Sequence, residues 1–374
     1  MVNIEFDLEV PMPFFSIVIP VYNTGRYLRA CLESVAGQSF SDFEVVVVDD
    51  ASSDNSGAII EGYTLEDERF RAVTHVENRG RHLSRMTGIK QARGEYVIFL
   101  DSDDELSVNA LESLHGRLLA DPVDILHFGM SVVSHETIPE EERVVFEQGA
   151  NTAIGKRAGR DVLRTVFDQD CGYGQDWRVI QRVFRGPIIS DAFDVMEGAR
   201  LDWMEDAYEC FAACVLAESS DSLDECRGYI YHYGRGTSGV NKISVVEDDY
   251  FCKALAQCLN ASARFAEGRF DKMVDRCVDG LRMKCLELLA NDILIRLDEV
   301  DWASGLASFA KRFGETNAAR EFYRFARDRA YELLQDEDVD LLDGDILFDY
   351  LALAESMVPT DDDMCDLGRY RTEK

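Results

Sequence analysis

A buried strand that runs straight into acidic residues is the most informative feature of this sequence. Residues 96–100 are five apolar or aromatic residues in a row, which predicts a strand buried on both faces. Such strands are typical of parallel α/β sheets, where ligands bind outside the carboxyl ends of the strands. Asp101, Ser102, Asp103 and Asp104 follow at once. Carboxylates two residues apart at a strand end can hold a divalent cation that binds a diphosphate, whereas a solvated acidic loop is the alternative.

The first hundred residues alternate between strand and helix patterns. Strands are predicted over 15–21, 43–48 and 70–76, and helices over 27–36 and 83–92. This alternation predicts right-handed crossovers and a parallel sheet. The ends of three strands would then meet at one edge of the sheet, bringing together Tyr22-Asn23, Asp49-Asp50 and Asp101-Ser102-Asp103. We interpret this convergence as a ligand site.

Four motifs in this region resemble those of family 2 glycosyltransferases of the GT-A fold. They occur in the family's order and at its spacing, over residues 18–23, 48–56, 78–88 and 94–104. The resemblance implies an α/β fold with a Rossmann-like, mainly parallel sheet flanked by helices. It also implies a nucleotide-sugar donor, usually a UDP-sugar, and Mn²⁺ or Mg²⁺ as the cofactor.

The resemblance also assigns donor-binding roles to the residues that match the motifs. Pro20 and Tyr22 would line the base pocket, and Asp50 would accept a hydrogen bond from the uracil ring. A carboxylate suits this contact because the imide N–H of uracil is a donor that needs an acceptor. Asp101 would contact the ribose or a metal-bound water, and Asp103 would bind the metal in the DXD motif. The other expected donor contacts are Asn23, Ser53, Asn78, Gly80, Arg85 and Ser102.

Two positions depart from the family pattern. Ala51 stands where glycine is usual, and Met86 stands where asparagine is usual. Glycine readily adopts positive φ and alanine does not, so the conformation of the turn at Ala51 is in question. The one short basic cluster in this acidic region either contacts the diphosphate and the uracil or forms a solvated helix start. Its members are Arg79, Arg81, His82 and Arg85, of which Arg85 matches the family best.

A second signature of the family resembles residues 183–211. In it, Glu205 and Asp206 open a predicted helix over 206–217. By this resemblance Asp206 is the general base that deprotonates the acceptor hydroxyl, and the like charge of Glu205 shifts the pKa of Asp206. Acidic residues also suit a helix start through capping and the helix dipole, so a purely structural role is the alternative.

The rest of this half is expected to complete the sheet. A strand is predicted at 123–128, and 130–133 and 143–147 alternate weakly, as antiparallel edge strands do. The aromatic run 229–233 resembles the last strand of the family. In and after it, His232 is either a third metal ligand or a structural residue, and the candidate phosphate contacts are Arg235 and Ser238.

The charge balance and apolar patterning limit the possible partners and location. The 374 residues include 39 basic and 71 acidic side chains, which gives a net charge of -32. This charge argues against nucleic acid or an anionic membrane as a direct partner. No stretch approaches the roughly 20 apolar residues of a spanning helix, and the start lacks a basic signal-peptide region. We therefore expect no transmembrane segment and a cytoplasmic protein, which could act either in the cytoplasm or at the inner face of the membrane.

The ten cysteines, without C-x-x-C pairs, predict reduced core thiols.

The length suits two domains. We expect a GT-A catalytic domain over 1–240, with a donor half at about 14–128 and an acceptor half at about 129–240. An all-helical C-terminal domain is expected over 241–374. Helical patterns support it at 250–265, 270–290, 293–313, 318–334 and 341–357. This domain carries no catalytic signature and is expected to pack on the catalytic domain, to form a homo-oligomer or to bind an acceptor or partner.

Two functions remain in view. The first is a metal-dependent, inverting, non-processive glycosyltransferase that moves a sugar from a nucleotide-sugar, expected to be a UDP-sugar, to a hydroxyl acceptor. The acceptor would be a glycan or lipid-linked molecule in surface polysaccharide or glycoconjugate biosynthesis. The second is a catalytically inactive relative that binds a nucleotide-sugar or a protein partner. The joint presence of Asp50, Asp101, Asp103 and Asp206 favours the enzyme. A processive synthase is rejected, because residues 175–179 only faintly resemble its Q-x-x-R-W motif and precede the Glu-Asp pair.

Overall fold

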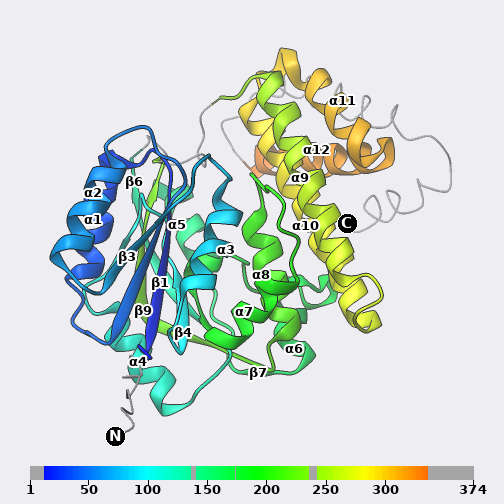
Figure 1. The fold of residues 1–374 in the computed structure, drawn as a ribbon. Helices are drawn as coiled ribbons and strands as arrows, with labels where there is room; N and C mark the ends of the chain where they lie inside the picture. The colour runs from blue at the N-terminus through cyan, green and yellow to red at the C-terminus, as the bar shows by residue number, and fades with distance from the viewer. Residues whose placement is uncertain (1–11, 136–139, 173, 236–241, 336–374) are drawn as a thin grey trace, which may run out of the picture. The chain divides into compact units, whose positions relative to one another are not determined.

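The computed structural model describes residues 12–135, 140–172, 174–235 and 242–335. Contacts divide the chain into two compact units, Met1–Gly239 with Ala261–Val278 and Val240–Asn260 with Asp279–Lys374. The first unit contains the sheet, and the described part of the second is helical (Figure 1). The α/β fold with a helical C-terminal region is therefore confirmed. The boundary near 240 lies outside the described residues, and the two expected domains stay a prediction.

A mixed, mainly parallel sheet forms the centre of the first unit. Its strand order is β3-β2-β1-β4-β8-β6-β9-β5, with β7 paired to β9. Strands β3, β2, β1 and β4 run parallel, and β8 is antiparallel to both of its neighbours. The strands are β1 Phe15–Val21, β2 Phe43–Asp49, β3 Phe70–Thr74, β4 Tyr96–Phe99, β5 Glu105–Leu106, β6 Ile125–Ser134, β7 Arg157–Ala158, β8 Arg182–Arg185 and β9 Ser219–Tyr233.

Helices cover this sheet. Every residue of β1 and β2 is buried, which agrees with a sheet covered on both faces. Helices α1 and α2 pack together on one face, and α3, α7 and α8 pack together on the other (Figure 1). The helices are α1 Gly25–Ala36, α2 Ser56–Glu66, α3 Arg81–Gln91, α4 Ala110–Ala120, α5 Glu140–Ala150, α6 Arg160–Phe167, α7 Gly186–Val195, α8 Glu205–Leu216, α9 Val245–Ala266, α10 Lys272–Arg296, α11 Trp302–Phe313 and α12 Glu315–Gln335.

The two expected antiparallel edge strands are wrong. Residues 130–133 continue β6, which pairs with β9 in parallel. Residues 143–147 lie within the helix α5. There Arg143 forms ion pairs with Glu140 and Glu147, three and four residues away. These spacings bring side chains together on a helix, so the charges of this segment fit a helix better than its weak apolar alternation fits a strand.

In the second unit, a small apolar cluster joins α10, α11 and α12. Its buried members are Leu294, Leu306 and Phe322. The single helix expected over 293–313 is interrupted, because α10 ends at Arg296 and a 3-10 helix over Glu299–Asp301 precedes α11. The pattern at 341–357 lies outside the described residues. Within the described part of the chain, no helix combines the length and the apolar character needed to cross a bilayer.

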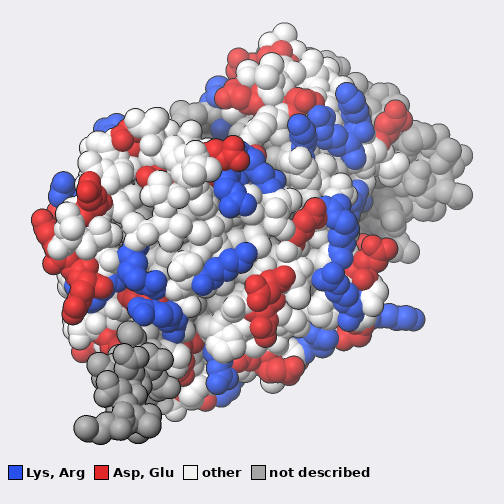
Figure 2. Space-filling view, in the orientation of Figure 1, with Lys and Arg blue, Asp and Glu red and all other residues white. Residues whose placement is uncertain are grey.

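The described cysteines are free thiols, and all but Cys171 are buried, as expected for reduced core residues. On the face drawn in Figure 2, the basic side chains lie in small groups among acidic ones. That face shows no broad basic surface of the kind that nucleic acid requires.

Candidate active site

The turns that follow β1, β2 and β4 lie together at the carboxyl edge of the sheet. The side-chain oxygen of Asn23 accepts a hydrogen bond from the backbone N–H of Ser53 at 2.8 Å. Thr24 Oγ1 donates to Ser102 Oγ at 2.9 Å. The first contact joins the β1 and β2 turns, and the second joins the β1 and β4 turns. The predicted convergence of strand ends is confirmed.

Ala51 adopts the left-handed conformation, with φ 61°. The turn therefore keeps a glycine-like backbone although it carries a Cβ. This conformation costs a non-glycine residue about 1–2 kcal/mol. A glycine at this position would avoid that cost, but it would also destabilise the folded state in part, because glycine gives the unfolded chain more conformational freedom.

Replacing Ala51 with glycine is expected to raise the free energy of unfolding by about 0.5–1 kcal/mol, because the strain of positive φ is relieved. Urea denaturation of the two proteins measures this difference. Ala58 is a matched control, because it is exposed within α2. Ala58→Gly should lower stability by about 1 kcal/mol. If both variants lose stability, the turn at Ala51 is not strained.

Asp50 anchors the segment that leads into α3. Its carboxylate is buried, with 3% of the residue exposed. Oδ2 accepts hydrogen bonds from Gly80 N at 2.8 Å and from Asn78 Nδ2 at 2.9 Å. Oδ1 lies 2.6 Å from His75 Nδ1 and accepts from Arg79 N at 2.9 Å. Both oxygens thus have protein donors, and a uracil N–H would have to share or replace one of them. The contact between Asp50 and uracil stays a prediction.

The three acids after β4 differ in their surroundings. Burial opposes the ionisation of Asp101, but the guanidinium groups of Arg81 and Arg85 outweigh it and hold the pKa of Asp101 below its usual value. Burial and the neighbouring Asp101 raise the pKa of Asp103. Among the described residues, no side chain forms an ion pair with the Asp103 carboxylate. Asp103 is therefore the acid of this motif that is left to bind an added cation.

Asp104 ties the motif to β9. Its carboxylate accepts hydrogen bonds from Tyr229 Oη and His232 N, each at 2.7 Å. Burial, followed by the charges of Asp103 and Asp101, raises the pKa of Asp104 to about 8. Burial is the first cause of both raised pKa values, and the negative charge of neighbouring carboxylates is the second. A divalent cation relieves this kind of excess charge.

The donor groups of this edge fit Mg²⁺ or Mn²⁺. Such ions prefer oxygen ligands, and Mg²⁺ sites commonly combine one or two carboxylates with substrate phosphates. Of the residues that the structure describes, no three His, Cys, Asp or Glu side chains could hold an ion by themselves. The available carboxylates therefore suit an ion that a bound diphosphate would help to hold.

His232 has both ring nitrogens engaged by protein side chains. Nε2 lies 2.8 Å from Glu105 Oε1, and Nδ1 lies 2.9 Å from His135 Nε2. Burial lowers the pKa of His232, which favours the neutral ring. These contacts give His232 a structural role, and it could ligate a metal only by breaking one of them. Of the two roles that the sequence left open, the structure favours the structural one.

Arg85 is buried, which conflicts with its expected direct contact with the donor. Only 1% of its side chain is exposed. Its guanidinium donates to Glu209 Oε2 at 2.8 Å and to Asp101 Oδ1 at 3.0 Å. His82, with no exposed side-chain surface, lies 2.8 Å from the other oxygen of Glu209. Arg85 therefore binds Asp101 from within the core. Arg81 is the more exposed of the two arginines, with 46% of its side chain exposed.

The start of α8 contributes two acids, Glu205 and Asp206, to the same region. Met204 precedes it in a left-handed conformation, with φ 59°. Glu205 Oε1 lies 3.4 Å from Arg81 Nη1. Burial and the charge of Glu205 raise the pKa of Asp206. An aspartate with a raised pKa suits general base catalysis near neutral pH.

The remaining expected donor contacts differ in accessibility. Pro20 is buried within β1, and Ser102 is 5% exposed. Tyr22 is 50% exposed, and Asn23 and Ser53 are also exposed. Ser238 lies outside the described residues. Arg235 is half-buried, donates to the carbonyl of Asp103 at 3.1 Å and lies over the ring of Tyr27 at 4.7 Å.

Sequence reasoning missed two supporting residues, Glu209 and His75. Glu209 lies four residues after Glu205, and that spacing places both acids on one side of a helix. His82 and Arg85 share a face of α3 in the same way. These spacings were the available signal for the buried ion pairs. His75 has no comparable signal, because its contact with Asp50 joins the residues that directly follow β3 and β2.

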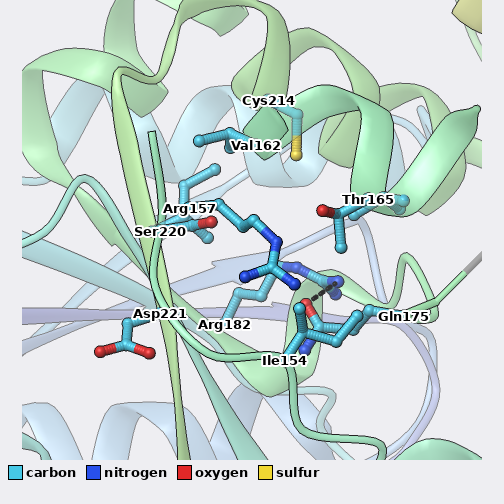
Figure 3. A pocket seen from close by; sticks show the side chains of 11 residues that line it. Ile154, Arg157, Val162, Thr165, Gln175, Arg182, Cys214, Ser220 and Asp221 are labelled. Carbon is cyan, nitrogen blue, oxygen red and sulfur yellow. Dashed lines mark hydrogen bonds between the residues drawn. The ribbon is translucent and has the colours of Figure 1, made fainter. Parts of the chain in front are cut away.

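Two hollows lie in the same unit. A small cavity of about 10 Å³, large enough for one water molecule at most, is lined by Arg157, Arg182 and Gln175, among others (Figure 3). Arg182 donates to Gln175 Oε1 at 3.4 Å, so Gln175 has a structural role here. A larger hollow of about 580 Å³ is lined by Arg26, Tyr27, His135, Gly234 and Arg235.

Comparison with known proteins agrees with this geometry. Residues 16–177 match the family described as Glycosyl transferase family 2. This match covers less than half of the chain and marks the segment as similar to that family. The matched segment contains the turns after β1, β2 and β4 but not Glu205 or Asp206.

Curated relatives match only part of this chain. Glycosyltransferase GlyG of Streptococcus pneumoniae serotype 4 is 39% identical over 112 residues, which is 30% of this chain and 37% of that protein. Putative glycosyltransferase EpsH of Bacillus subtilis is 29% identical over 232 residues, covering 59% of this chain and 60% of EpsH. The matched part of this chain thus spans about two fifths to three fifths of these relatives.

A solved structure extends the likeness of fold over most of the chain. The S. aureus TarS 1–349 fragment, solved in complex with UDP-GlcNAc, superposes with a TM-score of 0.60 at 19% identity. The match covers 91% of this chain and 90% of that fragment. At this identity the likeness establishes the fold.

Proposed function

We propose that this protein is a metal-dependent, inverting, non-processive glycosyltransferase that uses a UDP-sugar. The acceptor would be a hydroxyl of a glycan or lipid-linked molecule in surface polysaccharide or glycoconjugate synthesis. The observation that carries the proposal is the position of Arg81, whose Nη1 lies 3.7 Å from Asp101 and 3.4 Å from Glu205. Asp101 of the expected metal motif and Glu205, the neighbour of the expected base Asp206, thus lie within 4 Å of one guanidinium, which supports a single site. The UDP-GlcNAc complex of the similarly folded TarS fragment supports the choice of a nucleotide-sugar donor.

In this proposal each part of the site has one task. The segment 78–80, held by Asp50, forms the nucleotide side. Asp103 would hold the cation, which would neutralise charge on the departing diphosphate. Asp206 accepts the proton of the acceptor hydroxyl. Inversion follows if the acceptor oxygen attacks in one displacement, opposite the leaving UDP.

A donor screen tests the proposal. Hydrolysis and transfer are measured with UDP-, GDP- and dTDP-sugars in the presence of Mn²⁺. We expect turnover with at least one UDP-sugar. Tight UDP binding without turnover of any donor would instead favour the inactive, nucleotide-sugar-binding relative.

Replacing Asp103 with alanine is expected to weaken Mn²⁺-dependent UDP binding by at least about 10²-fold, since even outer partners of metal ligands are worth 10–100-fold. Isothermal titration with UDP, with and without Mn²⁺, measures the effect. Asp121→Ala is the control, because Asp121 pairs with Lys156 on the surface. Unchanged Mn²⁺-dependent affinity in Asp103→Ala would remove this residue from the metal site.

We also propose that the region 241–374 acts as a separate helical domain for self-association or partner binding. We propose that the protein is cytoplasmic. It would bind a lipid-linked acceptor at the inner face of the membrane.

A further inference from the structure

Arg81 is held differently from its basic neighbours on α3. His82 and Arg85 are buried and bind Glu209 at hydrogen-bond distance, 2.8 Å in each case. The side chain of Arg81 is 46% exposed, and its Nη1 lies 3.7 Å from Asp101 and 3.4 Å from Glu205. These longer distances describe ion pairs without close hydrogen bonds. The Arg81 guanidinium is therefore shared between two acids, each at ion-pair distance.

The two arginines contact different oxygens of Asp101. Arg85 takes Oδ1 at 3.0 Å, and Arg81 lies near Oδ2 at 3.7 Å. Because Arg85 is buried, it cannot move away without disrupting the core. A cation that approaches Asp101 from solvent therefore competes with Arg81. Arg81, whose side chain is partly exposed, is the part of this arrangement that can be displaced.

Arg81 also has the chemistry to bind phosphate. The guanidinium presents several N–H donors in a planar fork that matches phosphate oxygens. Arg81 is the first residue of α3, whose N-terminal end carries partial positive charge. In a chain of net charge -32, a diphosphate needs such local cations.

We propose that Arg81 binds a phosphate of the donor diphosphate and thereby couples donor binding to cation binding. This inference rests on the proposed function. Without donor, Arg81 lies between Asp101 and Glu205 and opposes cation binding at the acidic motif. When the diphosphate binds, the guanidinium moves to a phosphate oxygen and releases Asp101. By linkage, UDP strengthens Mn²⁺ binding and Mn²⁺ strengthens UDP binding by the same factor.

Arg81→Gln should change the two affinities in opposite directions. Without nucleotide, Mn²⁺ should bind about 3–10-fold more tightly, because its competitor is gone. Without metal, UDP should bind about tenfold more weakly, because a charged phosphate contact is lost. The ratio of Mn²⁺ affinity with and without UDP should lie at about 5–150-fold in the natural protein and at least about fivefold lower in the variant. Isothermal titration of the full chain gives all four constants.

Two further variants serve as references. Lys90→Gln removes the same charge from an exposed position on the same helix, about 13 Å farther along its axis. It should leave the coupling unchanged. Arg81→Lys keeps a cation without the fork and should retain part of the coupling. Urea denaturation confirms that each variant is folded.

The outcomes separate this inference from the proposed function. If Arg81→Gln weakens Mn²⁺ and UDP binding alike, or changes neither, Arg81 does not couple the two ligands and the inference is overturned. If the natural protein binds UDP and Mn²⁺ cooperatively but the variant does so equally well, only the inference fails. If the natural protein binds neither ligand, both the inference and the proposed function fail.

Discussion

Asp206→Asn is expected to reduce sugar transfer by roughly 10²–10⁴-fold, the usual worth of a positioned general base. Asparagine keeps the size of aspartate and can still accept the hydrogen bond that Asp206 Oδ1 receives from Ala207 N at 2.9 Å. It cannot take a proton. UDP and Mn²⁺ affinities should therefore change little, and the loss should fall on kcat. Steady-state kinetics with separate UDP titrations measure both quantities.

Glu205→Gln is the matched control. It removes the neighbouring charge but leaves the proposed base in place. Transfer should fall less than in Asp206→Asn. If Asp206→Asn is correctly folded and transfers sugar at nearly the natural rate, the base is Glu205 or another acid.

The pH dependence of the same reaction follows from the raised pKa of Asp206, caused by burial and by Glu205. A general base must be ionised, so transfer should fall as the pH is lowered through this pKa. Because the pKa is raised, the loss should occur nearer neutral pH than for an ordinary aspartate. Removing the Glu205 charge should move this limb to lower pH. A limb that does not move in Glu205→Gln would show that Glu205 has no influence on the base.

The strand ends were predictable from the sequence because the apolar residues of each strand give way to polar or acidic residues where the strand ends. The strand β1 begins and ends where the apolar pattern does, and β2 and β4 run into Asp50 and Asp101. Parallel pairing then leaves little freedom in where these ends meet. The segment at 143–147 was harder, because a weak apolar alternation competed with charges at helical spacing, and the charges indicated the observed structure.

Accessibility within the site could not be predicted from the sequence. Arg81 and Arg85 are one helical turn apart, and both were candidates for phosphate contact. Which of them is buried depends on Glu209, an acid on α8 that reaches α3 only through tertiary packing. The partners of Asp50 are likewise contributed by the next strand and the following loop. Motif spacing identifies such residues as functional candidates but does not show what each side chain contacts.

Glu209→Ala is expected to lower the free energy of unfolding by about 3–5 kcal/mol, the largest stability loss predicted for this protein. Glu209 has no exposed side-chain surface and binds both His82 and Arg85 at 2.8 Å. Its removal leaves the buried guanidinium of Arg85 with Asp101 as its close partner and leaves His82 without an acid. Glu197→Ala is the control, since Glu197 forms an exposed ion pair with Arg264. That change should cost no more than about 1 kcal/mol. Urea denaturation measures both.

A second substitution distinguishes a lost ion pair from a lost side-chain volume. If the cost of Glu209→Ala comes from weaker compensation of the Arg85 charge, then Arg85→Met combined with Glu209→Leu should be more stable than Glu209→Ala alone. Apolar side chains of similar size often replace a buried ion pair without loss of stability. The double variant also removes the guanidinium that holds Asp101 Oδ1. It should therefore regain stability but still bind UDP and Mn²⁺ more weakly than the natural protein. A double variant as unstable as Glu209→Ala would show that packing, and not charge, sets the cost at this position.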